Sequence, residues 1–216
     1  MAVEDACGAS AGRILWRIDA EELTLRPDAP LEGRLVTVEP LAERHREGLR
    51  EAASEDPGLF RYMLWPGDFD VWFDEAIAAR QDVPFAVLAG GRAMGSTRYL
   101  AFEPVHRRVE IGWTWLRPSA WGTGVNVETK LLLLERAFDE LGLQRVEFKT
   151  HALNERTRGS LLALGAQFEG IFRKHMILPT GPRDSAWYAI TDDDWPEVKA
   201  RLLWRLEAAD TAEPAE

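Results

Sequence analysis

The sequence is short of the residues that build disulfides and membrane spans. Its one cysteine, Cys7, excludes a disulfide framework and makes a reducing compartment the expectation. No apolar run approaches the roughly 20 residues that cross a bilayer, and no basic head followed by an apolar stretch indicates a secretory signal. We therefore predict a cytoplasmic protein without a membrane partner.

Histidine and positive charge are also scarce. The four histidines lack the spacing of paired metal ligands, so no metal site is predicted; they are His45, His106, His151 and His175. Lys and Arg total 26 against 36 Asp and Glu, a formal net charge of −10, which argues against nucleic-acid binding through phosphate contacts. An acidic chain attracts cationic partners such as amines, although the same charge also serves solubility alone.

The chain does contain enough apolar material for one full domain. Of its 216 residues, 46% are hydrophobic and nine are tryptophan. Residues 1–30 lack sustained periodicity and are predicted to be an extension, whereas residues 208–216 have the composition of a disordered acidic tail. Residues 31–207 are predicted to form a single domain.

Apolar periodicity predicts an α/β domain with a mixed (α+β) sheet. Strands are expected at residues 34–39, 84–88, 94–102, 109–116, 145–150, 166–178 and 185–190. Helices are expected at residues 41–53, 68–80, 127–141, 154–165 and 194–206. Because strands and helices do not alternate regularly, the sheet is predicted to be mostly antiparallel, with helices on both faces.

Local signals mark the ends of two of these helices. Gly142 and Gly165 are typical helix stops, since glycine adopts the left-handed conformation that follows a last turn. Asn154 and Asn126 are candidate N-caps, because an asparagine side chain can accept a hydrogen bond from a free N–H of the first turn.

The most informative segment is residues 109–126, V-E-I-G-W-T-W-L-R-P-S-A-W-G-T-G-V-N. It is predicted to be a strand, a short turn and the start of a helix, where free N–H groups and the helix dipole suit a phosphate. Gly122 and Gly124 would let the backbone approach a ligand closely. The segment lacks the G-K-[ST] ending of a Walker A loop and the third glycine of a dinucleotide fingerprint, and such turns are also common in purely structural roles.

Three stretches of the chain carry a family resemblance. They are V-E-I-G-W-T-W-L, then W-G-T-G-V-N-V-E-T-K-L-L-L-L-E-R-A-F, and then R-V-E-F-K-T-H-A-L-N-E-R-T-R-G-S-L-L-A-L-G-A. Over about residues 33–205 the chain resembles the GNAT acetyltransferase superfamily, in particular its Rim-type ribosomal-protein N-terminal acetyltransferases. Gly124 matches the glycine of the family's phosphate loop, whereas Trp121 stands where Gln or Arg is usual and Asn126 where the family has Gly or Ala.

The resemblance implies acetyl-CoA as the cofactor. Its pyrophosphate would lie on residues 121–126, and its pantetheine arm would pair with the backbone of residues 114–116 like an added strand, close to Asn154. The implied cofactor-binding residues are Thr114, Trp115, Leu116, Trp121, Gly122, Thr123, Gly124, Val125, Asn126 and Asn154.

The implied reaction is the direct attack of an amine on the thioester. The amine must lose a proton first, because a Lys amine has a pKa of ~10.4 and an N-terminal amine one of ~8. Glu110, on the strand that would meet the thioester, is the first candidate base, ahead of Glu147. Backbone N–H groups of residues 111–115 are the candidate donors to the oxyanion.

The leaving thiolate has less obvious partners. The family's usual tyrosine acid is replaced here by Leu161, so Thr157 and Ser160 are the candidate hydroxyls for the thiol. Both hydroxyls are equally consistent with a solvated helix surface. A free thiol has a pKa of ~8.5, so the thiolate needs little acid help.

The acceptor amine is not identified by the sequence. His151 and His175 are candidate acceptor-binding residues, and residues 56–70 and 175–184 are expected to shape the cleft. The acceptor is either a protein N-terminus or a small amine. The oligomeric state is a separate question, and the aromatic content is compatible with a homodimer. The alternatives are a non-catalytic acyl-CoA-binding or sensing module on the same fold, and an adaptor that binds partners through its tryptophans.

Overall fold

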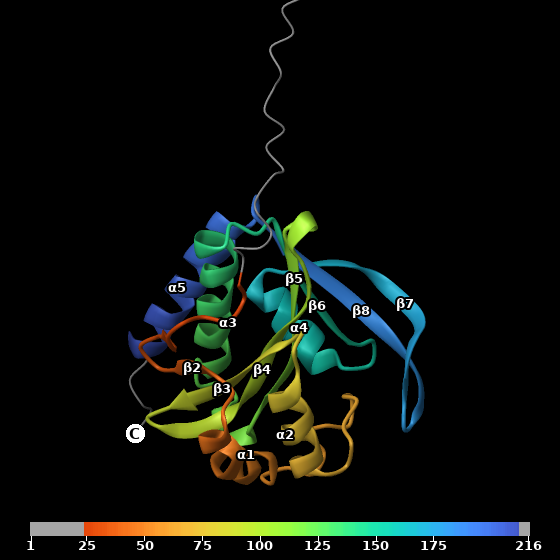
Figure 1. Cartoon of the computed structure of the whole chain (residues 1–216). Coiled ribbons are helices and arrows are strands. Elements are labelled where there is room, and N and C mark those ends of the chain that lie inside the picture. The colour runs from red at the N-terminus through yellow and green to blue at the C-terminus, as the bar shows by residue number, and fades with distance from the viewer. Residues whose placement is uncertain (1–23, 212–216) are drawn as a thin grey trace, which may run out of the picture.

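The computed structural model describes residues 24–211 (Figure 1). Cys7, most of the predicted extension and the last five residues of the predicted tail lie outside the described residues. The strands are β1 (Leu31–Glu32), β2 (Thr37–Pro40), β3 (Val83–Ala89), β4 (Arg92–Glu103), β5 (Arg108–Leu116), β6 (Arg145–His151), β7 (Gln167–Leu178) and β8 (Gly181–Thr191). The helices are α1 (Arg46–Ala53), α2 (Phe69–Ala78), α3 (Val125–Glu135), α4 (Glu155–Leu164) and α5 (Trp195–Thr211).

The described strands form one eight-stranded sheet in the order β1-β2-β3-β4-β5-β6-β8-β7. Every neighbouring pair is antiparallel except β5 and β6, which run parallel. The predicted mixed, mostly antiparallel sheet is therefore confirmed. Within residues 24–211, no helix is long and apolar enough to cross a membrane.

Helices cover both faces of the sheet, as expected. Alternation along β3 places Phe85 and Val87 in one hydrophobic cluster and Ala86 in the other. The first cluster contains apolar side chains of α3, α4 and α5, and α3 packs against α5 (Figure 1). The second contains those of α1 and α2, including Trp72. The sheet is thus the middle layer of three.

The first strand and first helix begin later than predicted. Strand β2 starts at Thr37 because the N–H groups of Leu35 and Val36 donate to the Glu128 carboxylate of α3 at 2.6 and 2.7 Å, and not to a neighbouring strand. Helix α1 starts at Arg46 because a 3-10 turn precedes it, in which His45 Nδ1 accepts a hydrogen bond from the N–H of Ala42 at 3.1 Å.

The predicted helix ends are confirmed at α4 and corrected at α3. The α-helical part of α3 ends at Glu135 and continues as a π-helix over Arg136–Glu140, after which Gly142 has φ +59°. Asn154 Oδ1 accepts from the N–H of Thr157 at 3.2 Å and caps α4, and Gly165 ends that helix with φ +111°. Asn126 is not the N-cap of α3. That position belongs to Gly124, whose φ of +85° lies in the left-handed region that glycine adopts without strain, so the helix begins two residues earlier.

Candidate active site

The parallel strands β5 and β6 separate soon after they meet. Their pairing covers residues 108–110 of β5 and 145–147 of β6. Beyond that point the strands diverge, and a cavity of about 740 Å³ opens between them. The rest of β5, the start of α3, one side of α4 and the segment that follows α1 all line it.

A β-bulge shapes the wall that β5 contributes. Ser96 of β4 pairs with Trp115 and Arg98 with Gly112, so Thr97 alone stands opposite two residues, Trp113 and Thr114. Trp113 has φ +50°, which is a strained conformation for a residue with a bulky side chain. The bulge thus re-aims the β5 backbone beside the cavity.

The turn between β5 and α3 is held from two sides. The indole Nε1 of Trp121 donates to the carbonyl of Leu116 at 2.9 Å. Arg117, which is 1% exposed, forms ion pairs with Glu51 and Glu55 at the end of α1. The turn is therefore fixed before any ligand arrives.

The two glycines of the turn have different roles. Gly122 lines the cavity with φ +80°, and a Cβ built on it would meet no atom within 4 Å. Gly124 is outside the lining, and its Cβ would lie 2.9 Å from Leu35 Cδ1. Gly122 thus leaves open space for a ligand, whereas the positive φ of the helix cap favours glycine at position 124.

Helix α4 faces α3 across the cavity. Asn126 Nδ2 donates to Ser160 Oγ at 3.3 Å, and both residues line the cavity together with Asn154 and Thr157. The guanidinium of Arg156 lies over the ring of Trp121. Arg156 therefore provides a positive charge beside the turn between β5 and α3. The arginine of the turn itself, Arg117, is already paired with Glu51 and Glu55.

Glu110 lies where β5 leaves β6. It is 2% exposed, and one of its carboxylate oxygens accepts from Lys149 Nζ at 2.7 Å. Burial raises the pKa of this carboxyl above its ordinary range, and Lys149 only partly offsets that rise. Glu147, its neighbour in register, is held by Arg108 at 3.1 Å and Arg145 at 2.8 Å. Of the two glutamates, only Glu110 lines the cavity.

Lys130 is a buried cation on the α3 side of the cavity. Its Nζ donates to Thr114 Oγ1 at 2.7 Å and to Thr97 Oγ1 at 3.4 Å, and it lies 5.9 Å from the centre of the Phe148 ring. Burial without a carboxylate partner lowers the pKa of Lys130 to about 7. This amine therefore titrates near neutral pH.

The two candidate histidines lie beside the cavity and not in its lining. His151 Nδ1 accepts from the N–H of Leu153 at 3.1 Å, and its ring is 5.1 Å from that of Tyr62. His175 Nδ1 lies 3.1 Å from Ser185 Oγ. Partial burial lowers the pKa of both imidazoles, so both are neutral at neutral pH.

The lining of the cavity is more positive than the chain as a whole. Among the residues that the structure describes, five Lys and Arg side chains line it against two Asp and Glu: Arg61, Lys130, Lys149, Arg156 and Arg183 against Asp56 and Glu110. The net charge of −10 therefore does not describe the site. A ligand with negative groups suits the lining better than a polycation does.

Comparisons with known proteins agree with this geometry. The model of the acetyltransferase (GNAT) domain matches residues 35–167. The chain belongs to the GNAT acetyltransferase family. A GCN5-related N-acetyltransferase from Brucella melitensis has a TM-score of 0.77 at 29% identity, covering 85% of this chain and 89% of that one. The uncharacterized N-acetyltransferase YoaA of Bacillus subtilis (strain 168) is 32% identical over 97 residues. These residues are 45% of this chain and 54% of YoaA, so the chain spans about half the length of this curated relative.

The Rim-type resemblance is confirmed for the fold. Mycobacterium smegmatis RimJ, solved in complex with CoA-disulfide, has a TM-score of 0.69 at 20% identity, covering 79% of this GNAT chain and 88% of RimJ. At that identity the likeness concerns the fold alone.

The sequence interpretation did not single out four charged residues of the cavity lining: Lys130, Lys149, Arg156 and Arg183. Lys130 lies three residues after Val127 and four before Leu134, on the apolar stripe of α3, and a lysine on such a stripe was a readable signal. Lys149 and Arg183 gave no comparable signal. Lys149 occupies an ordinary alternating position of β6, and Arg183 follows a turn.

Proposed function

We propose that this chain transfers the acetyl group of acetyl-CoA to a primary amine. The observation that supports this best is the divergence of β5 and β6 beside the N-terminus of α3. It leaves the β5 backbone from Ile111 to Leu116 along a cavity that starts at a buried carboxylate, Glu110. An extended thioester arm and an amine could meet there.

The residues present fit acetyl-CoA. The open space at Gly122 and the first turn of α3 suit a pyrophosphate, and Arg156 on Trp121 adds a cation near it. The β5 backbone suits the amide groups of the pantetheine arm. A bound acetyl-CoA supplies an activated acyl group whose carbonyl carbon is open to attack.

Glu110 is positioned to accept the proton of the acceptor amine. Its raised pKa brings it closer to that of the amine, which favours transfer directly or through a water molecule. Attack of the amine nitrogen on the acetyl carbon would form the new C–N bond and break the carbon–sulfur bond, with the amine proton going to Glu110 and the sulfur leaving as the thiolate. Thr157 and Ser160, which line the cavity, are the hydroxyls proposed to contact that sulfur.

The test measures release of free thiol from acetyl-CoA with amines of several classes: peptides with free N-termini, polyamines, amino sugars and amino acids. Thiol release that depends on the amine supports an enzyme and identifies its acceptor class. Tight acetyl-CoA binding without release from any class contradicts transfer and favours a non-catalytic acyl-CoA-binding module.

A variant pair tests the proposed place of the cofactor. Gly122→Trp fills the open space beside the first turn of α3 and should weaken acetyl-CoA binding by about 10-fold or more, measured by calorimetry. Gly90→Trp is the matched control, because Gly90 also has positive φ and open space but is outside the cavity lining. Equal acetyl-CoA affinity in the two variants would place the cofactor elsewhere.

A further inference from the structure

Arg183 of β8 is a buried arginine that lines the cavity on the side of Glu110. We infer that it binds a carboxylate of the acceptor, so that the acceptor is a small molecule carrying both an amine and a carboxylate. This inference rests on the proposed function and names the substrate class of the same site. Arg183 lies within residues 175–184, which the sequence predicted to shape the cleft, although no pattern singled out this residue.

The side chain of Arg183 has few partners for a buried cation. It is 7% exposed, and its Nε is buried without a hydrogen-bond partner. Within residues 24–211 its one hydrogen bond goes from Nη1 to the carbonyl of Tyr62 at 3.2 Å. A buried guanidinium without a paired carboxylate destabilises a fold, so a ligand that supplies the anion explains why it is there.

Strand register places Arg183 on the acceptor side of the cavity. Lys149 pairs with Trp187 and His151 with Ser185 across β6 and β8, so alternation along β8 puts Arg183 on the same face as Lys149. Lys149 in turn contacts Glu110, whose charge is close enough to stabilise the cationic form of Arg183. The proposed base Glu110 and the guanidinium of Arg183 thus face the same part of the cavity.

The other charged groups that line the cavity do not substitute for Arg183. The charge of Lys149 is balanced by Glu110 at 2.7 Å. Arg156 lies over Trp121, next to the turn proposed for the pyrophosphate, and Arg61 is solvent-exposed over the ring of Tyr62. Lys130 also lacks a carboxylate partner among the residues that the structure describes, but it lies on the α3 side, where its Nζ donates to Thr114 Oγ1 at 2.7 Å and to Thr97 Oγ1 at 3.4 Å. The uncompensated positive charge beside Glu110 therefore belongs to Arg183.

The chemistry of the guanidinium selects the ligand class. Its planar donors match the two oxygens of a carboxylate, and such charge-assisted hydrogen bonds are stronger than neutral ones. A polyamine would bring further positive charge to this arginine and is disfavoured. A small amino acid would place its carboxylate at Arg183 and its amine toward Glu110.

The experiment uses acceptor pairs that differ only in the carboxylate. Thiol release from acetyl-CoA is measured for a panel of α- and ω-amino acids, each paired with its own carboxamide, with the wild type, Arg183→Gln and Arg183→Lys. We expect the wild type to prefer the acid in kcat/KM by about 10-fold or more, Arg183→Gln to reduce this preference to about one, and Arg183→Lys to retain part of it. The pKa difference between the amines of a pair cancels when variants are compared.

Arg173→Gln is the matched control. Arg173 lies on the neighbouring strand β7, exposed and outside the cavity lining, so its loss should leave the acid-to-amide preference at the wild-type value. An unchanged preference in Arg183→Gln, or a wild type that favours carboxamides, polyamines or peptide N-termini, would overturn the inference while leaving acetyl transfer intact.

A binding measurement separates this inference from the proposed function. Calorimetry with the amino acid and its carboxamide, on the full chain with CoA present, needs no turnover. If no acceptor releases thiol, the proposed function fails, and a carboxylate-dependent affinity that Arg183→Gln abolishes still supports the role of Arg183. No difference in affinity between acid and amide overturns it. Thermal unfolding of each variant shows whether it is folded.

Discussion

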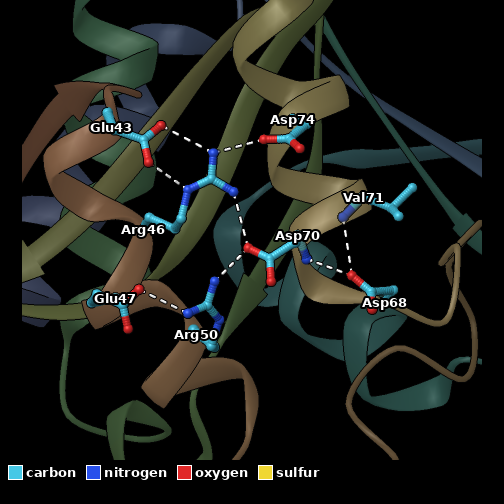
Figure 2. A network of polar contacts seen from close by, with 8 residues as sticks. All are labelled: Glu43, Arg46, Glu47, Arg50, Asp68, Asp70, Val71 and Asp74. Atoms are coloured by element: carbon cyan, nitrogen blue, oxygen red, sulfur yellow. Dashed lines mark hydrogen bonds and ion pairs between the residues drawn. The ribbon is translucent and has the colours of Figure 1, made fainter.

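Charged side chains are used in opposite ways in two regions of this GNAT chain. On the surface between α1 and α2, Arg46 contacts three carboxylates, those of Glu43, Asp70 and Asp74, and Arg50 contacts Asp70 as well (Figure 2). In the cavity, Glu110 has one cationic partner, and neither Lys130 nor Arg183 has a carboxylate among its hydrogen-bond partners within residues 24–211.

The difference separates structural charges from functional ones. Partly exposed arginines with several carboxylate partners hold two helices together, and each pair contributes little because solvent screens the exposed carboxylates. Buried charges without full pairing destabilise the fold, so they persist where chemistry or a ligand needs them. Changes in the cavity should therefore alter rates and pH profiles, and changes between α1 and α2 should alter stability slightly.

The largest effect is expected for Glu110→Gln. An amide cannot accept the proton of the amine, so kcat should fall roughly 10³-fold while acetyl-CoA affinity changes little. In the wild type, kcat/KM should fall as the pH drops through the raised pKa of Glu110, because only the ionised carboxylate is a base. Steady-state rates measured over a pH series that extends well below neutral test both effects.

Glu147→Gln is the matched control for Glu110→Gln. Glu147 is the register neighbour on β6, is also buried, and is held by two arginines outside the cavity lining. Its loss should lower stability and leave kcat close to that of the wild type. Wild-type rates in Glu110→Gln, or equal losses of kcat in both variants, would remove Glu110 as the base.

A smaller effect is expected for Lys130→Met, on stability. Because the folded pKa of Lys130 is lowered to about 7 while that of the unfolded chain is ~10.4, the unfolded chain binds the extra proton between those values. The contribution of this lysine to stability therefore rises with pH across that window. The gain on replacement should be greatest below about pH 7 and shrink by roughly 2 kcal/mol between pH 7 and 9, since one pH unit corresponds to about 1.4 kcal/mol and the folded lysine is half protonated at pH 7.

Denaturant unfolding at several pH values measures this change. Lys199→Met is the control, because Lys199 pairs on the surface with Glu135 and Asp139 and these partners raise its pKa. Its effect should be constant from about pH 7 to 9, below both its folded and its unfolded pKa. A pH-independent effect of Lys130→Met would show that the amine of Lys130 keeps the ordinary pKa of a solvated lysine and stays protonated in the folded chain.

The sequence predicted what local pattern determines. Apolar periodicity located every predicted strand and helix, and the capping signals at Asn154 and Gly165 are where they were expected. It missed β1, and it placed the start of α1 and the ends of α3 and α5 several residues away from where they lie. The sequence prediction failed where a residue far away in the chain determines the local structure or the partner of a side chain. The start of β2 depends on Glu128, 92 residues from Val36, and Arg183 contacts Tyr62 across 121 residues. Arg183 is an unpaired cation because, among the described residues, the fold gives it a carbonyl and no carboxylate as its hydrogen-bond partner. Residue spacing in the sequence does not show such partners.

The smallest effect is expected for Asp70→Asn, at the centre of the α1–α2 contacts in Figure 2. Both arginines keep another carboxylate, Glu43 or Glu47, so the melting temperature should fall by no more than about 3 °C at low salt. The difference should disappear near about 1 M salt, where charges are screened within about 3 Å. Asp74→Asn removes a carboxylate that contacts Arg46 alone, so its effect should be smaller still. A fall above about 10 °C in Asp70→Asn would contradict the division between the two regions, because an exposed carboxylate would then stabilise the fold as strongly as a buried one.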